Sequence, residues 1–133
     1  MKTSMNSIVL PVIVAALLSA CERPSPEELR QRQPLPEKDF VGDATLGKPL
    51  FDANCARCHG LGGRGTEQGP PLVHRVYRPG HHSDMSFHYA IKNGTRQHHW
   101  HFGDMPPVSG VSAEDTVHIV VYVREEQRRA GIR

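Results

Sequence analysis

The chain has 133 residues, of which 38% are hydrophobic and 6% aromatic, so it is long enough for one small domain and no more. Its formal net charge is +2, from 16 lysines and arginines against 14 aspartates and glutamates. This even balance, with basic residues scattered along the chain, argues against nucleic acid as a partner.

Residues 1–20 are predicted to be a signal peptide. Lys2 gives a positive start, and Ile8 to Ala20 is an uncharged, mostly apolar run. The run is too short to cross a bilayer of about 30 Å, which needs about 20 apolar residues. It ends in Leu-Ser-Ala-Cys, which resembles a bacterial lipoprotein box. That resemblance implies cleavage before Cys21 and acylation of Cys21, with simple cleavage near Ala20 as the alternative.

Residues 21–41 are predicted to be a flexible tether. The segment is rich in proline and charge, and such a composition buries too little apolar surface to fold. A lipid on Cys21 would hold the following domain, residues 42–133, at the periplasmic side of a bacterial membrane. Without the lipid, the protein would be soluble in the periplasm.

A first helix is expected from about residue 44 to residue 56. Asp43 is a suitable N-cap, and apolar residues recur after it at helical spacing. Pro49 fits only within the first turn of a helix, so the regular part is expected to begin around Lys48.

Residues 55–59 read Cys-Ala-Arg-Cys-His, and C-x-x-C-H is the pattern that attaches haem c. The thiols of Cys55 and Cys58 would bond the haem vinyl groups, and His59 would become an axial iron ligand. A zinc site would need a second pair of ligands, and the only other cysteine is Cys21. A thioredoxin-like pair would need a βαβ context that the sequence lacks. The pattern therefore predicts one covalently bound haem c.

Two further helices are expected after the motif. One, capped by Ser83 or Asp84, should run to about Asn93. The other follows Ser112 with a capping-box pattern and ends before Gly131. The predicted fold class is therefore all-α, with long loops between a small number of helices.

Residues 42–131 together resemble the small monohaem c-type cytochromes, in which a helix leads into C-x-x-C-H and a C-terminal helix crosses the first one. The resemblance implies about three helices and long loops around one covalently attached haem. Gly47 and Tyr122 would supply the close crossing of the terminal helices. Residues 69–72, Gly-Pro-Pro-Leu, resemble the loop whose proline carbonyl accepts the proximal imidazole N–H, and Pro71 would play that part.

The resemblance also implies Met105 as the sixth iron ligand, opposite His59. Met105 lies on a segment stiffened by Pro106 and Pro107, whereas Met85 begins a predicted helix and is expected to pack in the core. A thioether ligand raises the reduction potential relative to two imidazoles. Because both axial positions would be filled, we expect an electron carrier that docks redox partner proteins and is not itself an enzyme.

Seven of the nine histidines lie between residues 74 and 101, which departs from the plain family pattern. The simplest interpretation is a solvated polar rim. A second metal ion, copper or zinc, is an alternative, because imidazole suits both ions. The candidate ligands would be His81 and His82 with His98, His99 or His101.

Two other functions stay open at this point. A histidine within residues 98–101 could replace Met105 in some redox or pH state, which would make the protein a haem-based sensor with a labile sixth ligand. Alternatively, the chain could be the subunit through which electrons enter a larger oxidoreductase.

Overall fold

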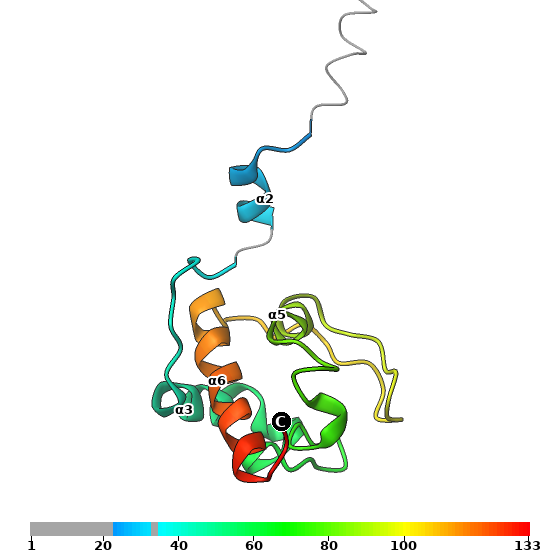
Figure 1. Cartoon of the computed structure of the whole chain (residues 1–133). Helices are drawn as coiled ribbons and strands as arrows, with labels where there is room; N and C mark the ends of the chain where they lie inside the picture. The colour runs from blue at the N-terminus through cyan, green and yellow to red at the C-terminus, as the bar shows by residue number, and fades with distance from the viewer. Residues whose placement is uncertain (1–22, 33–34) are drawn as a thin grey trace, which may run out of the picture. The chain divides into compact units, whose positions relative to one another are not determined.

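The computed structural model describes residues 23–32 and 35–133 of the chain (Figure 1). The chain divides into two compact units, residues 1–34 and 35–133. The predicted signal peptide and the predicted lipid attachment at Cys21 lie outside the described residues. Among the residues that are described, no helix is long and apolar enough to cross a membrane.

The described part of the first unit, residues 23–32, contains the helix α2 (Pro26–Arg32), which lies inside the predicted tether. It begins with a reciprocal pair of hydrogen bonds: the Glu28 N–H donates to Ser25 Oγ at 3.2 Å, and the Ser25 N–H donates to Glu28 Oε2 at 2.7 Å. Leu29 in this helix is 51% exposed. The prediction of an unfolded tether therefore missed this helix. Its start is stabilised by local capping, and its leucine stays exposed.

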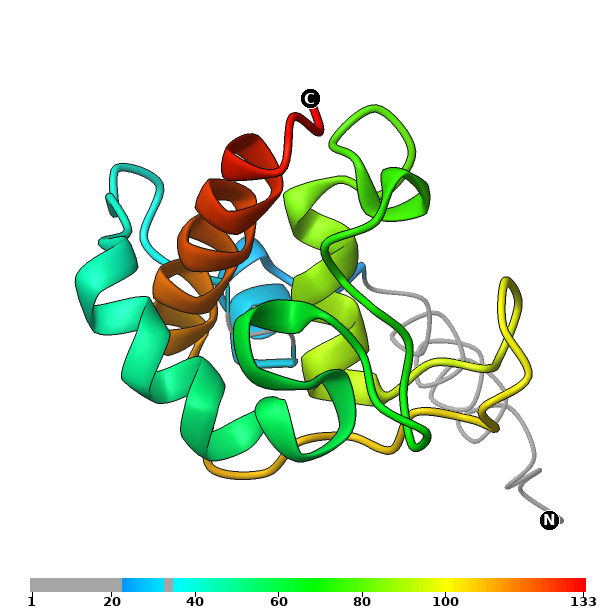
Figure 2. The same cartoon turned by 90° about the horizontal axis from the view of Figure 1, so that it is seen from below.

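The second unit is all-α, as predicted. The described residues contain no β-strand, only an isolated antiparallel bridge between Thr95 and Met105. The longer helices are α3 (Ala44–Asn54), α5 (Asp84–Asn93) and α6 (Ala113–Arg129). Figure 2 shows α6 lying between α3 and α5. The remaining turns are short: α4 (Ala56–His59), η2 (Leu61–Gly63) and η3 (Arg75–Tyr77).

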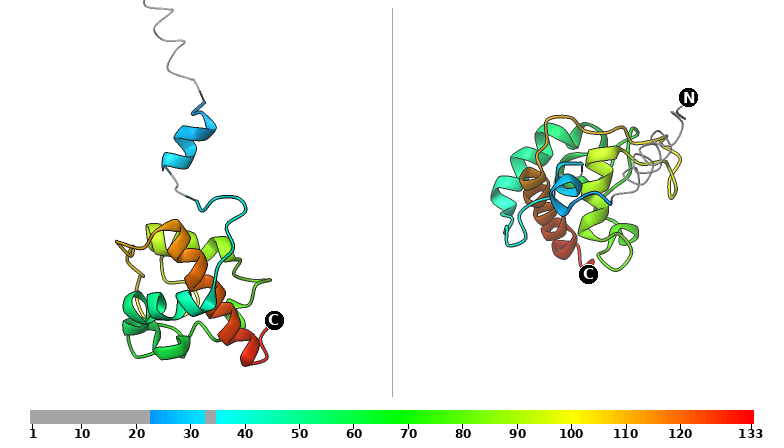
Figure 3. Two further views of the ribbon diagram at one scale, coloured as in Figure 1. Left: turned by 90° about the vertical axis from the view of Figure 1, so that its left-hand side faces the viewer. Right: turned by 90° about the horizontal axis from the view of Figure 1, so that it is seen from above.

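The helices α3 and α6 cross at Gly47, and the crossing is seen from another side in Figure 3. A Cβ atom on Gly47 would lie 1.9 Å from the His118 carbonyl oxygen and 2.9 Å from Tyr122 Cβ. Only glycine lets the two backbones approach this closely. Phe51, one turn further along α3, is fully buried and packs on the Tyr122 ring at a centroid distance of 5.4 Å. The predicted close contact between Gly47 and Tyr122 is confirmed.

The predicted cap of α3 and its predicted start near residue 44 are also confirmed, but the expectation that its regular part begins only around Lys48 is wrong. The Asp43 carboxylate accepts the Thr45 N–H at 2.7 Å, and the helix begins at Ala44 rather than around Lys48. Pro49 therefore lies inside the helix. Its missing N–H costs one backbone hydrogen bond, but the cap before it and the α6 contact after it hold the helical geometry on both sides.

The other two long helices match their predicted ends. Ser83 is the N-cap of α5, and Gly94 follows its last residue. Ser112 and Asp115 form a complete capping box at the start of α6, with side-chain to backbone bonds of 3.0 and 3.2 Å. Gly131 has a φ of 76°, a left-handed conformation that ends the chain's last helix.

Candidate haem site

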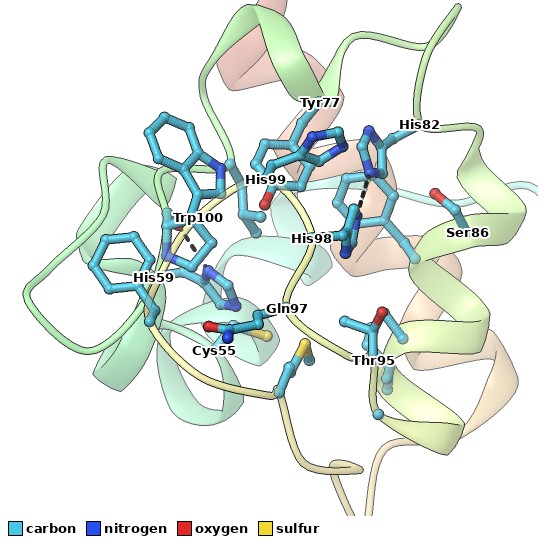
Figure 4. A pocket seen from close by; sticks show the side chains of 18 of the residues that line it. Cys55, His59, Tyr77, His82, Ser86, Thr95, Gln97, His98, His99 and Trp100 are labelled. Carbon is cyan, nitrogen blue, oxygen red and sulfur yellow. Dashed lines mark hydrogen bonds between the residues drawn. The ribbon is translucent and has the colours of Figure 1, made fainter.

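The helices of the second unit enclose an apolar cavity of about 400 Å³ (Figure 4). Its walls come from all three long helices and from the loops on either side of α5. The apolar part of the lining includes Phe51, Leu72, Phe87, Ile91, Ile119 and Val123. Phe51 of α3 and Ile119 and Val123 of α6 belong to this lining, so the packing of α3 against α6 forms one wall of the cavity.

The two cysteines of the C-x-x-C-H motif lie where α3 ends and α4 begins. Both are free thiols and half-buried, and Cys55 lines the cavity. The Cys55 N–H donates to the Phe51 carbonyl, and the Cys55 carbonyl accepts the His59 N–H. The motif therefore forms a continuous helical turn. Burial, with a smaller effect of Cys58, raises the pKa of the Cys55 thiol to about 11.

His59 is buried at the inner end of the motif and is 8% exposed. Its Nδ1 lies 2.9 Å from the Pro70 carbonyl oxygen. A carbonyl can only accept, so Nδ1 carries the proton and Nε2 keeps a free lone pair. Burial lowers the pKa of the imidazole, which favours the neutral form that a metal ligand requires.

The prediction that Pro71 accepts this hydrogen bond is wrong, because Pro70 does. Gly69 packs against the motif so closely that a Cβ there would lie 2.8 Å from the Cys58 carbonyl oxygen. The Thr66 N–H donates to the Gly69 carbonyl at 3.0 Å. These contacts bring the loop against the motif one residue earlier than predicted. The Gly-Pro-Pro-Leu pattern alone could not distinguish two adjacent carbonyls.

Met105 lines the same cavity as His59. Its backbone is held by two hydrogen bonds with Thr95, each of 2.9 Å. Gly94, with a φ of 71°, leaves room for the Met105 carbonyl, since a Cβ there would lie 2.5 Å from that oxygen. The bridge therefore keeps the Met105 residue in place through its main chain.

Met85 does not line the cavity, and the prediction that it packs in the core is wrong. It lies in the first turn of α5 and is 38% exposed. The buried face of this helix begins at Phe87. Of the two methionines outside the predicted signal peptide, only Met105 is placed to reach a ligand in the cavity.

Trp100 provides a test of whether the cavity suits a haem. Its indole Nε1 is buried and makes no hydrogen bond of normal geometry, although it lies close enough to the Tyr77 phenol to oppose the larger rise that burial causes in the pKa of that hydroxyl. A buried donor left without an acceptor costs about 1 to 3 kcal/mol. Haem carries propionate groups that accept such bonds. The residues around this apolar cavity therefore fit the haem that the motif predicts. They offer two thiols, an imidazole with a free lone pair, a thioether and an unpaired hydrogen-bond donor.

Arg124 is a residue of this region that the sequence did not reveal. It is 7% exposed on α6 and donates to the backbone carbonyls of Tyr77 and His82, and its Nε pairs with Asp84 at 2.8 Å. Gln127 Nε2 supports the same loop by donating to the Leu72 carbonyl at 2.8 Å. These bonds attach the loop before α5 to α6. The only sequence signal is a pair of polar residues, three positions apart, on an otherwise apolar face.

The structure brings together four of the five candidate histidine ligands of a second metal. They are His81 and His82, before α5, and His98 and His99, in the loop after it. His101 is exposed and takes no part in these ring contacts. His74 accepts the Val76 N–H and packs edge-on against Trp100, so its role is structural.

Comparison with known proteins agrees with this geometry. The profile of the cytochrome c family matches residues 44–127, which is well over half of the chain. The chain therefore belongs to the cytochrome c family. It is a small c-type cytochrome that binds haem c covalently and serves in electron transfer.

Two curated relatives illustrate the similarity. The cbb3-type cytochrome c oxidase subunit CcoP of Azospirillum sp. (strain B510) is 34% identical over 83 residues, 62% of this chain and 26% of that protein. Cytochrome c-554(547) of Halothiobacillus neapolitanus is 48% identical over 33 residues, 25% of this chain and 36% of that protein. The chain thus spans well under two thirds of either relative. No solved structure matches the chain significantly.

Proposed function

We propose that this chain is an electron carrier whose haem is bonded to Cys55 and Cys58, with His59 and Met105 as axial ligands. The observation that carries the proposal is that His59 and Met105 line one cavity, each held by backbone contacts. When bound, the haem supplies an iron that alternates between ferric and ferrous and so accepts or donates one electron.

The role of the surrounding residues is to hold the ligands and to exclude water. The Pro70 carbonyl orients His59 and increases the electron donation of its Nε2. The Thr95 bridge positions Met105, and a thioether at the sixth position favours ferrous iron. With both axial positions filled, the site has no place for a substrate, and the chain's task is to set the potential and to dock partners.

The docking surface that we propose surrounds the motif. Arg57, between the two cysteines, and Arg64 are exposed, and Lys48 pairs with Asp52 one turn before the motif. Exposed charges of this kind attract a partner without holding it tightly, which suits a carrier that must dissociate after each transfer.

A second candidate function is a subunit through which electrons enter a larger oxidoreductase. It is favoured by the similarity to an oxidase subunit, whose matched region is about a quarter of that protein. Stable co-purification of a catalytic partner from the native membrane would support this function, and recovery of the haem protein alone would support the mobile carrier.

We further propose that lipid on Cys21 anchors the protein at the periplasmic face of a bacterial membrane. The support is the lipoprotein-box pattern before Cys21 and the charged segment that follows it. Expression of the full chain and of Cys21→Ser, followed by membrane fractionation, tests this. The wild type should sediment with membranes and the variant should be soluble; equal distribution of both would contradict the anchor.

Absorption spectra of the holoprotein test the axial ligands. We expect a low-spin reduced spectrum and, in the ferric state, the weak long-wavelength band of sulfur-to-iron charge transfer. Met105→Ala should abolish this band, whereas Met85→Ala should retain it because Met85 lies outside the cavity. A band that survives in Met105→Ala, or its absence from the wild type, would contradict Met105 ligation. Ferrous iron that is five-coordinate and binds carbon monoxide would instead support the sensor function.

A further inference from the structure

Two loops face each other with a pair of consecutive histidines on each, and the pairs meet through their Nε2 atoms. His81 Nε2 lies 3.3 Å from His99 Nε2, and His82 Nε2 lies 3.4 Å from His98 Nε2. Figure 4 shows His82 and His98 pointing toward each other, with His99 beside them. We refer to these four residues as the histidine cluster.

The backbone determines which nitrogen of two of these rings carries the proton. His82 Nδ1 lies 2.9 Å from the Val76 carbonyl oxygen, and His98 Nδ1 lies 2.8 Å from the Arg96 carbonyl oxygen. Because a carbonyl accepts and cannot donate, both Nδ1 atoms carry the proton. In the neutral rings both Nε2 atoms therefore bear lone pairs, and these lone pairs face each other across 3.4 Å. Such a contact is repulsive unless a cation lies between the two nitrogens.

The same arrangement is the usual second shell of a metal-binding histidine. A ligating imidazole almost always donates its other N–H to a carbonyl or carboxylate, which sets the tautomer and the ring direction. His82 and His98 have this partner already. The position of His82 is supported in turn, because buried Arg124 donates to the His82 carbonyl.

Two distances within the histidine cluster, one in each facing pair, suit a tetrahedral ion. Two nitrogens that bind one zinc ion at about 2.0 to 2.1 Å with tetrahedral angles lie about 3.3 Å apart. The two Nε2 to Nε2 distances, 3.3 and 3.4 Å, match this value. The ligand nitrogens of His81, His82 and His99 all lie within 4.8 Å of one another. His81 and His99 are exposed, so rotation of their rings can close the remaining gap.

We propose that the histidine cluster is a second metal site, separate from the haem iron, which binds one tetrahedrally coordinated Zn²⁺ through imidazole nitrogens. His82 and His98 are its preoriented ligands, and His81 and His99 complete the shell. The site joins the loop before α5 to the loop after it at the rim of the haem cavity, which His82, His98 and His99 also line. Bound zinc would therefore cross-link the two loops that cover one side of the cofactor.

Calorimetric titration of the holoprotein with Zn²⁺ alone tests the proposal. We expect one ion per chain, and an affinity reduced at least about tenfold in His82→Gln and in His98→Gln. His99→Gln is the more conservative variant, because no backbone hydrogen bond to its ring would be lost, and it should show a similar loss. The matched control is His101→Gln, which removes an exposed histidine from the same loop and should bind zinc as the wild type does.

Zinc-edge X-ray absorption of the titrated holoprotein provides a readout that the haem iron does not obscure. Imidazole nitrogens at about 2.0 Å in fourfold coordination would support the site. The haem absorption spectrum should keep its axial-ligand features when zinc binds, because the cluster does not include His59 or Met105.

Three results would overturn the proposal. One is the absence of zinc binding to the wild type, which would mean that a shared proton alone separates the facing lone pairs. Another is an equal loss of affinity in His101→Gln. The third is zinc binding that displaces an axial haem ligand. None of these results alters the test of Met105 described above, so the two proposals can fail independently.

Discussion

The crossing of α3 and α6 and the histidine-bearing loops around α5 are held by opposite kinds of contact. At the crossing, Gly47 brings the two backbones together and fully buried Phe51 fills the space beside it. The loops, by contrast, are held mainly by polar contacts: Arg124 and Gln127 donate to backbone carbonyls, and imidazoles face each other. The crossing therefore tolerates no added volume, whereas the loops tolerate changes of volume but not the loss of a donor.

The largest expected effect is that of Gly47→Ala, which adds a methyl group where no space exists. The new Cβ would meet the His118 carbonyl oxygen at 1.9 Å, so the helices must move apart. We expect the free energy of unfolding of the holoprotein to fall by more than about 3 kcal/mol. Thermal unfolding followed by circular dichroism measures it. Gly80→Ala, where nothing lies within 4 Å of the added Cβ, is the control and should unfold as the wild type does.

Among changes to the loops around α5, Arg124→Met should lower stability most. It keeps the approximate side-chain volume and removes the hydrogen-bond donors of the guanidinium. The carbonyls of Tyr77 and His82 would lose their charged partner, and we expect a loss of about 3 kcal/mol in chemical denaturation. Arg129→Met is the matched control on the same helix, since Arg129 is largely exposed and pairs only with neighbouring glutamates. Equal stability of both variants would contradict the role assigned to Arg124.

The Trp100→Phe variant tests whether the buried indole N–H gains a hydrogen-bond acceptor when the haem is bound. If it donates to a propionate, the variant should lose about 1 to 3 kcal/mol of holoprotein stability. Its reduction potential should also fall, because a less stabilised propionate charge favours ferric iron. A variant more stable than the wild type would show that the donor stays unpaired in the holoprotein.

The smallest expected change in the free energy of unfolding is that of a substitution at the start of α6, at the edge of the crossing. Ser112→Ala removes the side chain that accepts the Asp115 N–H at 3.0 Å. We expect a loss of about 1 kcal/mol, measured by urea denaturation. Ser109→Ala, in the loop before the helix, should leave stability unchanged.

Short-range signals predicted much of this molecule correctly. The cap at Asp43, the capping box at Ser112 and the end of α5 at Gly94 each depend on a few neighbouring residues, and all three are confirmed. Local signals were less decisive where they competed with one another. Pro49 lies inside a helix that it was expected to delay, and the helix α2 lies in a segment that was expected not to fold.

The amino-acid sequence by itself determined the cofactor and the fold class. The C-x-x-C-H spacing is a property of five consecutive residues, and the helix signals around it are equally local. Only the tertiary structure decided which proline carbonyl meets His59, that Arg124 is buried, and that His82 faces His98. The hydrogen bonds involved join residues that are 11 to 47 positions apart. Their geometry depends on how the loops pack against α6, and no local pattern encodes that packing.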